Sequence, residues 1–153
     1  MLVDGANVLG AGAQGWWRDR PAAIGRLADR LSAFAEASGR HVELVLDAPD
    51  LPEGQRGSIV VHHSRRRGRD AADDRIRELV GERDHATVEV VTLDRPLRAD
   101  VERLGPQVIG AGTFFALLPY PLLFRFLASP PPRSRTGRME QPVHAFSRAR
   151  EMM

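Results

Sequence analysis

Six aspartates of this 153-residue chain stand where carboxylates could act on a bound ion. Asp4, Asp47 and Asp94 each follow a short apolar run, and the segment RGRDAADDRI adds Asp70, Asp73 and Asp74. In open parallel sheets the ligand crevice lies outside the carboxyl ends of the strands. Several like charges converging there are costly unless a hard cation such as Mg²⁺ or Mn²⁺ neutralises them. Such an ion can activate water and stabilise a phosphoryl oxygen, which is the chemistry of a metal-dependent nuclease.

Each acid also has a plainer interpretation when it is taken alone. An aspartate before glycine, as in Asp4 and Gly5, usually marks a turn. The acids of residues 70–74 could simply complement a helix dipole in the first turn of a helix. Three separate groups of strand-end or helix-start acids together favour a site.

The elements that must position these acids alternate between strands and helices. Strands are expected at residues 2–4, 42–46, 59–62, 88–92 and 108–109, and helices at 21–38, 70–80, 96–104 and from Thr113 onward. The first strand is short enough to suggest that it begins upstream of Met1. Strands that are continuously apolar and alternate with helices predict an α/β fold, with a mainly parallel sheet and helices on both faces.

Composition and charge divide the chain into a domain and a tail. Residues 1–118 hold 16 Arg and 18 acids, whereas residues 119–153 hold 6 Arg and 2 acids, so the tail carries the basic excess. We expect residues 1–118 to form the domain and residues 119–153 to be a flexible Pro/Arg-rich tail that adds nonspecific RNA affinity. The absence of cysteine excludes disulfides and thiol chemistry. Because no signal peptide or membrane span is visible, a cytoplasmic protein is expected.

Three acidic blocks resemble those of NYN/YacP-like domains in the PIN-like nuclease superfamily. They are VDGANV at residues 3–8, DDRI at 73–76 and VVTLDRPLR at 90–98, and together they cover about residues 1–118 in the same order. The resemblance implies a Rossmann-like three-layer fold whose acids bind Mg or Mn and hydrolyse RNA phosphodiesters. It implies catalytic roles for Asp4, Asn7, Asp73, Asp74 and Asp94, with Asp4, Asp74 and Asp94 as metal ligands. Asn7 would then be the amide that orients water, substrate or Asp4.

Other residues are candidates for contacts with single-stranded RNA. Arg65, Arg66, Arg67 and Arg69 precede the acidic helix, and guanidinium groups match phosphate oxygens, although such a run is usually a solvated loop. Trp16 and Trp17 could stack on unpaired bases, or one of them could pack under its loop. His62 and His63 would point to opposite faces of a strand, which makes them a poor pair of metal ligands.

Two phosphate-binding motifs are rejected. Gly10, Gly12 and Gly15 match the G-x-G-x-x-G spacing, but Asp4 and Gly5 separate them from the strand that a dinucleotide site requires. We expect these glycines to form a mobile loop near the site instead. A P-loop needs a lysine, and the chain has none.

The sequence therefore predicts a metal-dependent endoribonuclease of α/β fold. The alternative is a non-catalytic RNA-binding protein that keeps the acidic pocket. The sequence does not decide between a monomer and a homodimer.

Overall fold

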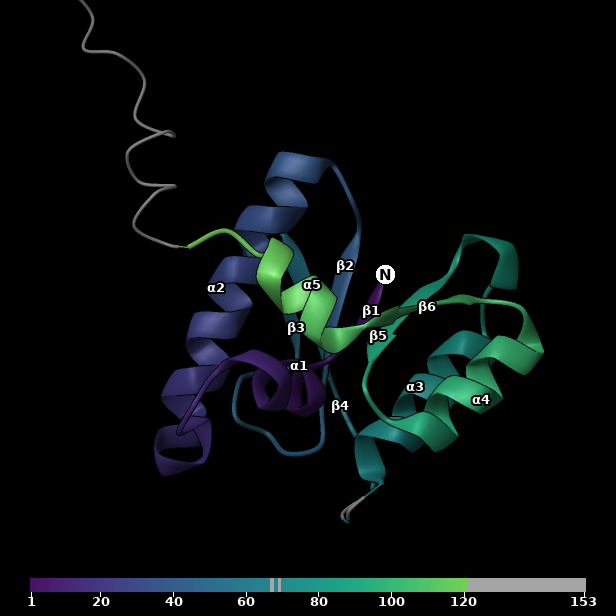
Figure 1. The fold of residues 1–153 in the computed structure, drawn as a ribbon, viewed down its shortest axis with the longest axis horizontal. Helices are drawn as coiled ribbons and strands as arrows, with labels where there is room; N and C mark the ends of the chain where they lie inside the picture. The colour runs from purple at the N-terminus through teal and green to yellow at the C-terminus, as the bar shows by residue number, and fades with distance from the viewer. Residues whose placement is uncertain (67, 69, 121–153) are drawn as a thin grey trace, which may run out of the picture.

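The computed structural model describes residues 1–66, 68 and 70–120, and it contains one six-stranded sheet (Figure 1). In spatial order the strands are β3 (Gly54–Arg56), β4 (Ile59–His63), β2 (Val42–Leu46), β1 (Leu2–Asp4), β5 (Glu89–Thr92) and β6 (Gln107–Gly110). All neighbouring strands are parallel except β3, which pairs with β4 in antiparallel register. The expected mainly parallel sheet is confirmed.

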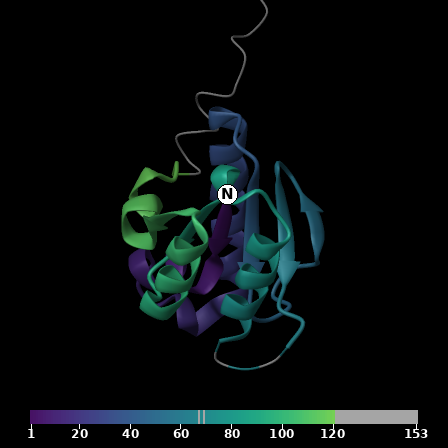
Figure 2. The ribbon, with the colours of Figure 1, turned by 90° about the vertical axis from the view of Figure 1, so that its right-hand side faces the viewer.

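Helices cover both faces of the sheet, as Figures 1 and 2 show. The helices α1 (Gly5–Gly12), α2 (Arg20–Ser38) and α5 (Ala111–Leu117) share one buried cluster with Val3, Leu44 and Val91 of the sheet. The helices α3 (Ala71–Gly81) and α4 (Arg95–Leu104) pack with Leu2 and Val45 on the other face. Two short 3₁₀ turns complete the described chain, η1 (Trp16–Asp19) and η2 (His85–Thr87). The α/β three-layer architecture follows.

The sequence at the two ends of the long helix α2 explains where this helix begins and ends. The Asp19 carboxylate accepts a hydrogen bond of 3.2 Å from the backbone N–H of Ala22, which caps the first turn, and Pro21 suits that turn. Gly39 ends the helix in the left-handed region at φ 67°, where a glycine carries no steric penalty. Both boundaries agree with the sequence pattern to within one residue.

The glycine-rich stretch after Asp4 is a helix, so the expected loop at Gly10 and Gly12 is wrong. Gly12 contacts α5 so closely that a Cβ atom there would lie 1.9 Å from Cδ1 of Phe115. Packing of α1 against α5 therefore overrides the low helix propensity of glycine. Gly15 does lie outside α1, at a φ of 70°.

The buried carboxylate of Glu43 links β2 to the segment that follows α3. Glu43 of β2 accepts hydrogen bonds of 2.6 Å from Nε2 of His62 and 2.7 Å from Nη2 of Arg83. Burial alone would raise the pKa of Glu43, but these two partners outweigh it and lower the pKa to about 2. The neighbouring His63 ring instead contacts the carbonyl oxygen of Leu51 at 2.6 Å. The two histidines thus have separate structural partners and do not form a pair.

The predicted boundary between domain and tail, at residue 118, is not tested. Leu118 is buried against the core, and residues 121–153 lie outside the described residues. Within the described part of the chain, no helix is both long enough and apolar enough to cross a bilayer.

Candidate active site

Asp4 is the most enclosed acid at the carboxyl edge of the sheet. It ends β1 and begins α1, and only 1% of its surface is exposed. The backbone N–H of Asn7 donates to its Oδ1 at 3.1 Å, and the Asn7 side-chain amide donates to its Oδ2. Burial raises the pKa of Asp4, the hydrogen bonds from Asn7 and Thr92 oppose this rise, and the nearby charge of Asp47 adds to it. The carboxylate is held in one orientation by protein donors.

Asp94 lies two residues beyond the end of the neighbouring strand β5. It is the N-cap of α4, where its Oδ1 accepts a hydrogen bond of 2.7 Å from the backbone N–H of Leu97. Its own backbone N–H donates to the hydroxyl of Thr92 at 3.1 Å, and that hydroxyl donates to Oδ2 of Asp4 at 3.3 Å. Thr92, which is not among the site residues predicted from the sequence, therefore connects Asp4 and Asp94.

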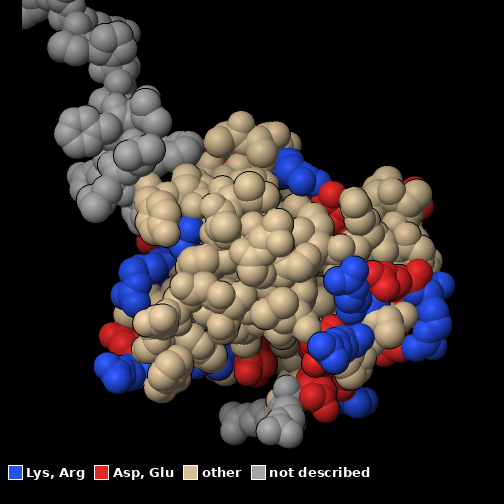
Figure 3. Space-filling model, viewed as in Figure 1, with Lys and Arg blue, Asp and Glu red and all other residues tan. Residues whose placement is uncertain are grey.

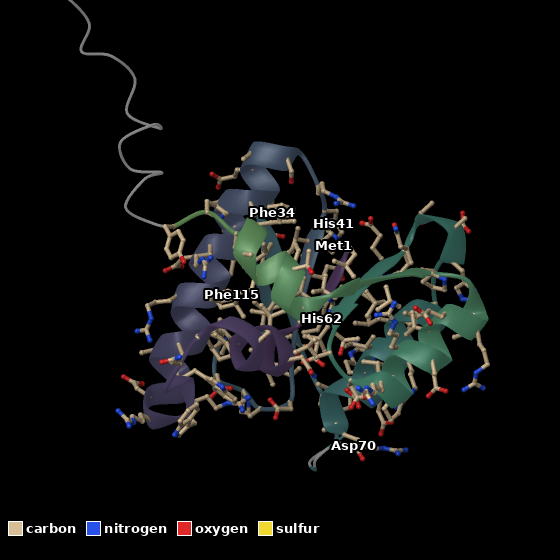
Figure 4. The ribbon with its side chains drawn as sticks, viewed as in Figure 1. Met1, Phe34, His41, His62, Asp70 and Phe115 are labelled. Atoms are coloured by element: carbon tan, nitrogen blue, oxygen red, sulfur yellow. The ribbon has the colours of Figure 1, made fainter. Side chains whose placement is uncertain are left out.

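Asp73 brings a third carboxylate to this edge from the first turn of α3. Burial, followed by repulsion from Asp4 and from Asp94, raises its pKa to about 6, against the attraction of Arg77. The carboxylate therefore lies in the field of both strand-end acids. Figure 4 shows Asp70 at the beginning of the same helix, and its charge raises the pKa of Asp73 further.

Asp74, the next residue along α3, has different partners. Its carboxylate forms an ion pair of 3.2 Å with Arg77 and a longer one of 4.0 Å with Arg66. Arg77 also contacts Asp100 of α4 at 3.0 Å. Asp74 thus belongs to a partly exposed ion-pair network, and the structure brings Asp73 rather than Asp74 close to the strand-end acids.

Asp47, the acid at the end of β2, is also neutralised by a neighbour. Arg20 at the beginning of α2 forms an ion pair with Asp47, and its Nε contacts Asp50 at 2.8 Å. This arginine fixes the loop that follows β2. Asp4, Asp73 and Asp94, in contrast, form no ion pair with an arginine among residues 1–66, 68 and 70–120.

The donor set of this site suits a hard divalent cation. Its atoms are carboxylate oxygens, and the pKa of Asp73 is raised by burial and then by repulsion from Asp4 and Asp94, which a cation would relieve. Within the described residues, no three His, Asp or Glu side chains are gathered tightly enough to enclose an ion unaided. The predicted ligand roles of Asp4, Asp74 and Asp94 therefore remain predictions.

Two of the predicted RNA-contacting arginines, Arg65 and Arg66, lie beside this edge. Arg65 and Arg66 are exposed and line a hollow of about 200 Å³ together with His63, Ser64 and the loop that begins at Asp47. Arg67 and Arg69 lie outside the described residues. The hollow offers guanidinium and hydroxyl donors, which are the groups that bind phosphate oxygens.

The two tryptophans have different environments. Trp16, the predicted RNA contact, is half-buried against the core, with the guanidinium of Arg20 5.7 Å from its ring centre. Trp17 is 66% exposed, and its ring meets that of Trp16 edge-on at 6.5 Å. Of the two, Trp17 has the indole face that an unpaired base could reach.

Comparison with known proteins identifies the fold. The crystal structure of Rae1 (YacP) from Bacillus subtilis matches 75% of this chain and 70% of its own, with a TM-score of 0.60 and 22% identity. A tryptophan-to-leucine mutant of the same protein matches 72% of this chain and 68% of its own, with a TM-score of 0.57 and 23% identity. No protein-family model and no curated protein sequence matches the chain. The chain has a YacP-like fold, as its three acidic blocks indicated.

Proposed function

We propose that this protein is a metal-dependent endoribonuclease whose site is formed by Asp4, Asp73 and Asp94. The observation that carries the proposal is the position of three acids from separate elements: Asp4 ends β1, Asp94 caps α4 just beyond β5, and Asp73 lies in the first turn of α3. Burial, followed by repulsion from Asp4 and Asp94, raises the pKa of Asp73, which supports their proximity. The YacP-like fold adds support at the level of architecture. Asp73 replaces Asp74 in the metal set because Asp74 is already paired with Arg77.

The chain's own residues would perform three tasks. Asp4, Asp73 and Asp94 would hold Mg²⁺ or Mn²⁺, which when bound supplies activated water and charge neutralisation at the phosphate. Asn7 and Thr92 would hold Asp4 in position through the hydrogen bonds described above. Arg65 and Arg66 would bind phosphates of the RNA backbone beside the acids.

Single-stranded RNA is the proposed substrate form. Trp17 is exposed, and an indole ring can stack on a base only when that base is unpaired. We also propose a cytoplasmic location. The chain contains no cysteine and so cannot form the disulfides that are common in proteins of oxidising compartments.

Cleavage of single-stranded RNA with Mn²⁺ or Mg²⁺ tests the proposal. Activity should depend on the ion, and Asp4→Asn and Asp73→Asn should abolish it while the far-ultraviolet circular dichroism stays native. Calorimetry should show ion binding to the unsubstituted chain and not to the two variants. RNA binding without ion-dependent cleavage would instead support the non-catalytic alternative.

A further inference from the structure

A mainly apolar cavity of about 240 Å³ lies among α1, η1, α2 and α5. Its walls include Leu9 and Ala13 from the chain of α1, Trp16 of η1, Leu27 of α2, and Phe115 and Tyr120 at the end of the described chain. Asp4 stands at the other end of α1, so the cavity is separate from the acidic site. Figure 4 shows Phe115 between α5 and α1.

Arg30 of α2 fixes the chain at the rim of this cavity. Its guanidinium donates to the carbonyl oxygens of Phe115, Leu118 and Pro119 at 3.1, 2.8 and 3.1 Å. It also lies over the rings of Phe115 and Tyr120, at 4.3 and 4.9 Å from their centres. The positive charge thus meets the negative end of the α5 dipole and two aromatic faces. Only 8% of Arg30 is exposed, so the anchor is internal.

Arg26 and Arg30 of α2 line one side of the cavity, and the helices α1 and α5 on its other sides carry no charge, although 27% of the whole chain is charged. Figure 3 shows that the surface over α5 is tan, with arginines and acids gathered at its two flanks. Leu117 and Tyr120 are 65% and 70% exposed on this side. A surface of this kind is typical of one that another segment covers.

We propose that residues 121–127 of this same chain, PLLFRFL, dock over the cavity. The chain leaves the described residues at Tyr120, on the cavity rim, and 33 residues follow. The first seven of them contain five large apolar side chains, Leu122, Leu123, Phe124, Phe126 and Leu127. Because Arg30 holds the preceding residues, docking is intramolecular, with an effective concentration on the order of millimolar. Burial of these side chains against the apolar walls would drive it.

The docked segment stabilises the C-terminal end of α1, where Leu9 and the C-cap residue Ala13 line the cavity. This helix contains Gly5, Gly10 and Gly12, so its own propensity is low and its stability depends on neighbours. Residues 128–153 take no part in the docking. A chain that ends at Leu127 therefore keeps the cover, and a chain that ends at Tyr120 loses it.

Trp16 reports on the cavity because it lines the wall. With Trp17→Phe as the background, all tryptophan emission comes from Trp16, and acrylamide quenching measures its exposure. The full chain and the chain ending at Leu127 should show the same weak quenching. The chain ending at Tyr120 should show stronger quenching and red-shifted emission. A synthetic peptide of residues 121–127 added to the shortest chain should restore the protection.

A substituted full chain provides a test that does not depend on truncation. Phe124→Ser with Phe126→Ser should expose Trp16 in the same way and lower the melting temperature by about 5 °C, because two buried rings are lost. Phe146→Ser, the same change in residues 128–153, is the matched control and should leave both readings unchanged.

Two results would overturn the proposal. Equal quenching of the full chain, the shortest chain and the double serine variant would show that this segment does not cover the cavity. Protection that disappears on dilution of the full chain would assign the cover to a second copy. If the shortest chain fails to fold, the double serine variant decides between these outcomes at a temperature where its circular dichroism is native.

Discussion

The hydroxyl of Thr92 donates a hydrogen bond of 3.3 Å to Oδ2 of Asp4. The same hydroxyl accepts a bond of 3.1 Å from the backbone N–H of Asp94. Thr92 is 1% exposed, so water does not replace either bond easily. The Thr92 side chain thus links Asp4, at the end of β1, to Asp94, just beyond β5.

Replacing this hydroxyl should weaken ion binding without changing the fold. Thr92→Val keeps the shape but leaves the Asp94 N–H without its acceptor and Asp4 with one donor fewer. We expect Mn²⁺ affinity to fall by about 10-fold, as for other residues that orient metal ligands. Thr92→Ser, which keeps the hydroxyl, should retain most of the affinity. Calorimetric titration of both variants measures the difference, and equal affinities would remove Thr92 from the site.

The adjacent pair Asp73 and Asp74 provides a matched comparison on α3. Asp73→Asn should lower Mn²⁺ affinity by at least about 10-fold and abolish cleavage, because it removes a proposed ligand. Asp74→Asn removes an ion pair with Arg77 that is partly exposed, so its effect should be small. Titration and cleavage rates for both variants decide. If Asp74→Asn is the damaging change, the ligand set predicted from the sequence is correct and the present proposal is wrong.

The raised pKa of Asp73 predicts how stability depends on pH in the ion-free protein. The folded pKa of about 6 exceeds the ordinary value of 3.8, so the folded chain binds this proton more tightly than the unfolded chain does. The stabilising effect of the protonated carboxyl should therefore be lost as the pH rises through this window. Asp73→Asn should abolish that loss. Urea unfolding of both proteins on either side of the window, with chelator present, measures it, and parallel pH profiles would contradict the assignment.

The positions of Asp4 and Asp94 at the carboxyl edge of the sheet could be predicted from the sequence because apolar strands followed by acids are local patterns. The sequence could not separate Asp73 from Asp74, since neighbouring helix positions differ by about 100° and only the packing of Ile76 and Leu79 fixes the rotation of α3. The helix α1 was missed because its glycines suggest a loop, whereas contact with Phe115 stabilises it. The edge strand β3 was missed because its three residues, GQR, have no apolar pattern.

Asn7→Ala should depress cleavage while α1 still forms. The cap of α1 depends on the backbone N–H of Asn7, which donates to Oδ1 of Asp4 and survives the substitution. The variant loses only the side-chain amide bond to Oδ2, which orients the carboxylate and helps to lower its pKa. We expect a turnover lower by about 10-fold, with unchanged circular dichroism. Unchanged turnover would limit Asn7 to a structural role.

The arginines beside the acids should determine how RNA binding depends on salt. Arg65 and Arg66 line the hollow at the end of β4, and each phosphate contact to single-stranded RNA contributes about 0.7 to the slope of log affinity against log salt. Arg65→Ser with Arg66→Ser should therefore lower the slope by about 1.4 if both arginines bind phosphate. The exposed Arg103, which pairs with Asp100 on α4, is a matched control, and Arg103→Ser should leave the slope unchanged. Fluorescence anisotropy with a labelled single strand, in chelator to prevent cleavage, measures the slopes. An unchanged slope in the double variant would mean that the two arginines form only a solvated loop.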